Sequence, residues 1–151
     1  MVNRPGTGRG TGASPVRRAA QVVGVVFLLV GLLGFIPGIT TDYDTMKFAG
    51  HESQAKLLGL FQVSILHNIV HLLFGVAGLA LARSVSGARS YLVGGGAIYL
   101  VLWLYGLVVG HDSPANFVPM NTADNWLHLF LGVGMIALGL ALTRRPGGSR
   151  H

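Results

Sequence analysis

The sequence predicts an all-α fold, a four-helix transmembrane bundle made of two tandem helical hairpins. Only 11% of the residues are charged and 51% are hydrophobic, whereas a soluble domain carries about 25% charged residues. Four stretches contain no Asp, Glu, Lys or Arg, and each is long enough for a helix to cross about 30 Å of hydrocarbon. A short polar motif also recurs in the second and fourth of these stretches.

The predicted spans are helical because a lipid-exposed segment must satisfy its backbone hydrogen bonds internally. They cover residues 19–41, 57–82, 90–110 and 125–143. The first apolar run exceeds the roughly 7–15 residues of a signal-peptide core and lacks a following A-x-A cleavage site, so we expect it to be retained. The chain then divides into a disordered cytoplasmic tail, a four-span membrane domain and a second cytoplasmic tail, at residues 1–18, 19–143 and 144–151.

The distribution of Lys and Arg predicts the orientation in the membrane. Nine of the 11 basic residues lie in the two tails and in the connection at residues 83–89, whereas Lys47 and Lys56 lie on the other side. Because positive charge accumulates on the cytoplasmic side, we expect a multi-pass plasma-membrane protein with both termini in the cytoplasm. The expected partners are the lipid bilayer and other membrane proteins or a second copy. The basic residues occupy tails rather than a folded patch, so no nucleic-acid partner is predicted.

The repeated motif is N-x-x-H-x-x-x-G-V, which begins at Asn68 and again at Asn125. At 100° per residue it places polar side chains in the outer half of one helix face and glycines in its inner half. We expect these two stripes to pack against each other. The first and third spans share only a weak glycine similarity, Gly24 with Gly94. The polar members of the stripes are His67, Asn68, His71, Asp124, Asn125 and His128, and the expected helix-packing glycines are Gly75, Gly78, Gly132 and Gly139.

The strings GLFQVSILHNIVHLLFGVAGL and ANFVPMNTADNWLHLFLGVGM resemble the two hallmark segments of an uncharacterised four-helix integral membrane family. That family is a domain of unknown function common in actinobacteria, and the resemblance covers residues 18–143. It implies a plasma-membrane protein and carries over no activity. A fainter likeness to DoxX-type membrane proteins concerns the fold alone. The positions that carry the motifs are His67, Asn68, His71, Gly75, Asn121, Asp124, Asn125, His128 and Gly132.

Intramembrane histidines are functional candidates by default, and three chemical interpretations remain open. His67, His71, Asp124 and His128 could ligate a metal that accepts nitrogen and oxygen donors. His71 and His128 could instead be the axial ligands of a b-type haem. The third and favoured interpretation is a cluster of interhelical hydrogen bonds that requires no cofactor.

The sequence therefore favours a non-catalytic structural or accessory membrane protein whose His/Asn cluster joins the second and fourth spans. No catalytic residue set is predicted, since the chain has no Cys and no serine in a nucleophile-elbow motif. A metal- or haem-binding redox protein is the alternative. A small transporter or channel is less favoured because no span is interrupted at mid-membrane.

Overall fold

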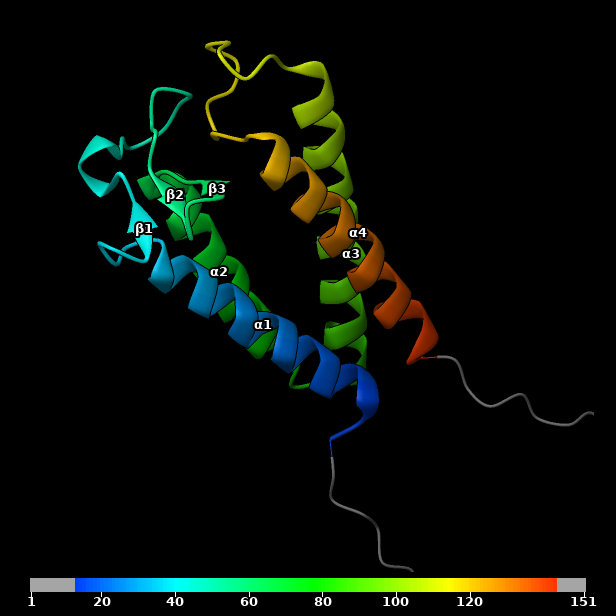
Figure 1. Ribbon diagram of the computed structural model, residues 1–151. Helices are drawn as coiled ribbons and strands as arrows, with labels where there is room; N and C mark the ends of the chain where they lie inside the picture. The colour runs from blue at the N-terminus through cyan, green and yellow to red at the C-terminus, as the bar shows by residue number, and fades with distance from the viewer. Residues whose placement is uncertain (1–12, 144–151) are drawn as a thin grey trace, which may run out of the picture.

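A computed structural model describes residues 13–143, which form four long helices joined at one end by irregular segments and a small sheet (Figure 1). The predicted tail at residues 144–151 lies outside the described residues, as does most of residues 1–18. We call the end that carries the sheet the loop end. The opposite end carries the start of the first helix, the end of the fourth and the short turn between the second and third.

The four predicted spans correspond to four helices with shifted ends. The helices are α1 (Pro15–Leu33), α2 (Ile65–Leu81), α3 (Val85–Val108) and α4 (Thr122–Ala141). The largest shifts lie at the loop end, where α1 stops at Leu33 and α2 begins only after its N-cap Ser64. At the other end, α1 begins at Pro15, because proline is well suited to the first position of a helix.

The shortened helix ends leave room for a three-stranded antiparallel sheet that the all-α prediction missed. Strands β1 (Thr40–Thr41), β2 (Lys56–Leu57) and β3 (Phe61–Gln62) pair in that order, and a 3-10 turn, η1 (Tyr43–Thr45), lies between the first two. The chain is thus mostly helical but not purely α. Strands of two residues give no alternating pattern, and their apolar residues extended the predicted helical runs.

Glycines bring the helices into backbone contact in two pairs. A methyl group at Gly24 of α1 would lie 3.0 Å from the carbonyl oxygen of Gly75 of α2, and one at Gly75 would lie 2.8 Å from the Gly24 oxygen. The same reciprocal contact joins α3 and α4, with 2.7 Å from Gly96 to the Gly132 oxygen and 3.0 Å in reverse. Small residues of this kind allow close approach of transmembrane helices.

The prediction that the glycine stripes of the second and fourth spans face each other is therefore wrong. Gly75 lies against α1, and Gly78 lies against Tyr91 of α3. Gly132 and Gly139 both lie against α3. The closest backbone contacts form at glycines, between α1 and α2 and between α3 and α4. The residue of α3 that makes the same contact as Gly24 of α1 is Gly96, and not Gly94 as the sequence suggested. A methyl group at Gly94 would have no neighbouring helix within 4 Å among the described residues.

An aromatic core lies where the two helix pairs meet. The ring of Phe27 from α1 stacks on that of Tyr99 from α3, with centroids 5.4 Å apart, and Phe74 from α2 contacts both. Met135 of α4 is buried in the same cluster. A second, smaller core beneath the sheet contains Leu57, so the sheet packs onto the bundle rather than extending into solvent.

Three helices, α1, α3 and α4, are long and apolar enough to cross a membrane. The remaining helix, α2, is also apolar but is shorter, with 17 residues. Large hydrophobic side chains project outward from the bundle, among them Leu73, Val101 and Phe130, each more than 60% exposed. Such surfaces are covered by lipid in a membrane protein, and the fold is that of a membrane protein.

We expect Gly132→Leu to destabilise the detergent-solubilised protein by about 1–3 kcal/mol, the usual effect of overpacking. The new side chain would collide with Leu100 and with the Gly96 backbone. Chemical unfolding followed by circular dichroism measures the change. Gly134→Leu is the matched control, because a Cβ there would have no neighbouring helix within 4 Å among the described residues. Equal loss of stability in the two variants would contradict the proposed helix contact.

Candidate functional site

Two N-caps at the loop end fix where α2 and α4 begin and thereby position the polar residues of their first turns. The Ser64 hydroxyl accepts a hydrogen bond from the His67 backbone N–H at 3.1 Å. The Asn121 side chain accepts from the Asp124 backbone N–H at 3.0 Å, and the Asp124 carboxylate accepts from the Asn121 backbone N–H at 2.9 Å. Such caps satisfy N–H groups that have no partner within the helix.

Three histidines lie together in the interior next to the aromatic core. The ring centroids of His67 and His71 are 4.4 Å apart, and those of His67 and His128 are 6.3 Å apart. The three side chains are at most 5% exposed. His71 lies 5.8 Å from Phe27 and His128 lies 5.2 Å from Tyr99, so each sits beside a ring from the helix paired with its own. The structure thus brings the polar ends of α2 and α4 together, although their glycines do not meet.

The interhelical hydrogen bonds predicted for these histidines are not formed by their buried Nδ1 atoms. Nδ1 of His67, His71 and His128 is in each case buried without a hydrogen-bond partner among the described residues. Burying a polar atom without a partner costs about 1–3 kcal/mol, and native proteins contain few such atoms. Three of them at one point is an arrangement that packing alone does not explain.

Asp124 and Asn125 do make bonds between elements. The Asp124 carboxylate accepts a hydrogen bond from the backbone N–H of Gln62 at 3.0 Å, which fastens β3 to the start of α4. The Asn125 amide donates to the Gly106 carbonyl at 3.1 Å, which joins α4 to α3. Asn68 occupies the matching place on α2, where its amide nitrogen lies 4.0 Å from the Met46 sulfur and its oxygen has no hydrogen-bond partner in residues 13–143.

The three histidines and Asp124 line an internal cavity of about 160 Å³, which we call the histidine chamber. Its remaining walls are hydrocarbon side chains from α1, α4 and the β2–β3 hairpin. The full lining is Val30, Leu33, Leu57, Leu58, Phe61, Val63, His67, His71, Asp124, Leu127 and His128. The chamber is therefore a polar patch at one side of an otherwise apolar hollow.

Sequence reasoning found the polar residues of the chamber but missed its roof. Residues Leu57, Leu58, Phe61 and Val63 were assigned to a transmembrane helix, because the apolar run continues through them without a charge. The positive φ of Leu58 and Gly59, at +54° and +70°, marks the turn between β2 and β3. Gly59 was the one available signal for a turn in this stretch.

The side chains of the described residues do not form a metal centre. No group of three or more His, Cys, Asp or Glu among them is arranged to hold a metal ion. One carboxylate oxygen of Asp124 is already engaged by two backbone N–H groups.

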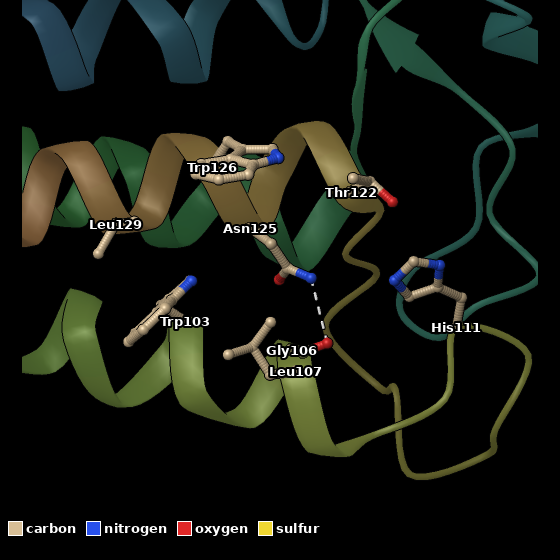
Figure 2. Close-up of a pocket in the computed structure, with 8 residues that line it drawn as sticks. All are labelled: Trp103, Gly106, Leu107, His111, Thr122, Asn125, Trp126 and Leu129. Atoms are coloured by element: carbon tan, nitrogen blue, oxygen red, sulfur yellow. Dashed lines mark hydrogen bonds between the residues drawn. The ribbon is translucent and has the colours of Figure 1, made fainter.

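A second hollow, of about 440 Å³, opens on the surface between α3 and α4 at the loop end (Figure 2). The indoles of Trp103 and Trp126 stand on its two walls, and the bond from Asn125 to Gly106 lies between these indoles and His111. His111 belongs to the loop that follows α3 and lies beyond the end of that helix. Indoles at this level fit the belt that tryptophan forms at membrane interfaces.

Residues 17–141 match the model of the family described as Domain of unknown function (DUF4383). The chain belongs to this family, which confirms the predicted membership of an uncharacterised family. No curated protein and no solved structure matches the chain. The likeness to DoxX-type folds and the actinobacterial distribution therefore stay predictions.

Proposed function

We propose that the protein is a multi-pass plasma-membrane protein with four spans and both termini in the cytoplasm. Three membrane-competent helices support this, and α2 lies against α1 with its own apolar surface toward the outside. Its 17 residues span about 26 Å at 1.5 Å per residue, near the lower limit for crossing a bilayer. The loop end then lies outside the cell, because nine of the 11 basic residues belong to the opposite end and the tails.

Topology reporters test this orientation directly. Alkaline phosphatase, which is active only outside the cytoplasm, is expected to be active when fused after Pro114 and inactive when fused after Gly87 or at the C-terminus. Green fluorescent protein at the same positions should give the reverse result. An active phosphatase at the C-terminus would contradict a four-span protein with both termini in the cytoplasm.

We infer further that the two hairpins are a tandem structural repeat about an axis along the membrane normal. Equivalent positions make equivalent contacts in the two halves. The ring of Phe27 lies beside that of His71, and the ring of Tyr99 lies beside that of His128 in the same way. Gly24 meets Gly75 as Gly96 meets Gly132, Gly34 meets Asn68 as Gly106 meets Asn125, and Ser64 caps α2 as Asn121 caps α4. Binding sites of repeat membrane proteins commonly lie between the repeats, where the histidine chamber lies.

The proposed function is non-catalytic binding of a small molecule in the histidine chamber. The observation that carries it is the presence of three buried Nδ1 atoms without partners around one cavity. A neutral imidazole offers one donor and one acceptor, so three of them can hold a polar group that enters the chamber. In this proposal the imidazoles bind the ligand. Without the ligand, their buried and unpaired Nδ1 atoms lower the stability of the bundle.

A structural role is the second candidate, and it rests on Asp124 and Asn125 rather than on the histidines. These two side chains bond to β3 and to α3, as the packing function of an accessory subunit would require. A metal- or haem-binding redox function finds less support, since the donor groups are not arranged around a metal position.

The stability of a histidine variant separates binding from packing. In delipidated protein we expect His128→Leu to raise the free energy of unfolding by about 1 kcal/mol, because an apolar side chain of similar size removes an unpaired polar atom. Denaturant titration in detergent measures the difference. His111→Leu, in an exposed loop position, is the control and is expected to leave stability unchanged. A loss of more than about 1 kcal/mol in His128→Leu would show that the imidazole stabilises the fold and would contradict the binding proposal.

A further inference from the structure

The accessible rim of the histidine chamber is entirely hydrocarbon. The three histidines and Asp124 are buried at its inner side. Leu58, on the turn of the β2–β3 hairpin, is 61% exposed and is the most exposed residue of the lining. The half-buried members of the lining are Val30, Leu33, Phe61 and Leu127. A molecule that reaches the imidazoles must therefore pass apolar side chains only.

The rim lies between helices that do not close against each other. Val30 and Leu33 belong to α1, and Leu127 belongs to α4. These two helices make few contacts and diverge toward the loop end (Figure 1). In a membrane, a rim of this composition between two spans faces the acyl chains of the bilayer, because hydrocarbon side chains are favoured there.

The roof over this rim carries backbone strain. Leu58 adopts a φ of +54°, in the left-handed region that favours glycine, and it does so at the tip of a hairpin that lines the chamber. Strained residues of this kind persist where the surrounding structure holds them, and they cluster at ligand clamps. The hairpin is held at its other end by the bond from Gln62 to Asp124.

We propose that the chamber takes its ligand sideways from the outer leaflet, between α1 and α4, and that the ligand is a lipophilic alcohol, phenol or ketone with a hydrocarbon body. This inference rests on the proposed binding function and names its substrate class. The hydrocarbon body lies along the rim, and the uncharged oxygen of the head accepts or donates a hydrogen bond at the imidazoles. A charged head is disfavoured, since a buried charge requires an opposite charge, and the one carboxylate in the lining is already bonded to two backbone N–H groups.

Photolabelling of the full-length protein in liposomes tests the inference with three probes that each carry a diazirine. Hexadecanol has both the body and the head, hexadecane has only the body, and butanol has only the head and dissolves in water. We expect hexadecanol to label the peptides around His67 and His128 about tenfold more than hexadecane, which is the contribution of one hydrogen bond. Unlabelled hexadecanol should compete for the same sites. Mass spectrometry of the digested protein locates the label.

Two variants of α4 control for the route. Leu127→Trp, on the rim, is expected to reduce hexadecanol labelling severalfold. Val133→Trp, on an exposed part of the same helix, should leave it unchanged. Leu58→Trp on the roof provides a second obstruction, which keeps the test valid if Leu127→Trp does not fold.

The possible outcomes test the entry route and the chemical class of the ligand separately from the binding function itself. Equal labelling by hexadecane and hexadecanol would overturn the requirement for a polar head. Labelling by butanol without labelling by hexadecanol would overturn entry from the lipid while leaving a binding chamber. No labelling of the chamber by any probe would overturn the proposed function and the inference together.

Discussion

The structure depends on two places where helices touch backbone to backbone. Gly24 and Gly75 join α1 to α2, and Gly96 and Gly132 join α3 to α4. Because no side chain separates these backbones, each pair forms a close unit, and the pairs meet through larger side chains such as Phe27 and Tyr99. The positions of His71 and His128 follow from this arrangement, since each approaches an aromatic ring of the helix paired with its own.

The chamber arises from a difference between the two halves. The connection from Gly34 to Ser64 is longer than the one from Val109 to Asn121, and the extra length contains the three-stranded sheet. The sheet covers one side of the junction between the helix pairs, and Asp124 fastens it to α4. Hydrocarbon side chains of the sheet and of α1 then surround imidazoles whose Nδ1 atoms have no hydrogen-bond partner within the described part of the chain. A hollow with buried imidazoles at its inner side thus forms beside the aromatic core.

Much of the fold could be predicted from the sequence because long uncharged apolar runs admit few structures in a membrane. The four helices and the gathering of His67, His71 and His128 could be predicted from charge and spacing alone. The ends of α1 and α2 did not follow, because Leu57, Leu58 and Leu60 are as apolar as a span and strands of two residues show no periodicity. The stripe on α2 was assigned to the wrong partner because a glycine face indicates close contact without indicating which helix makes it. Phe27, Phe74 and Tyr99 show how the two pairs meet, and nothing in the spacing of these residues suggests it.

The central claim is that the imidazoles of the chamber are reserved for a ligand. The most direct measurement is a high-resolution structure of the full-length protein in a bilayer that contains hexadecanol. The account predicts density for a non-protein molecule between α1 and α4, with its polar head within hydrogen-bond distance of His71 or His128. A collapsed chamber, in which His67, His71 and His128 bond to one another or to neighbouring backbone, would contradict it.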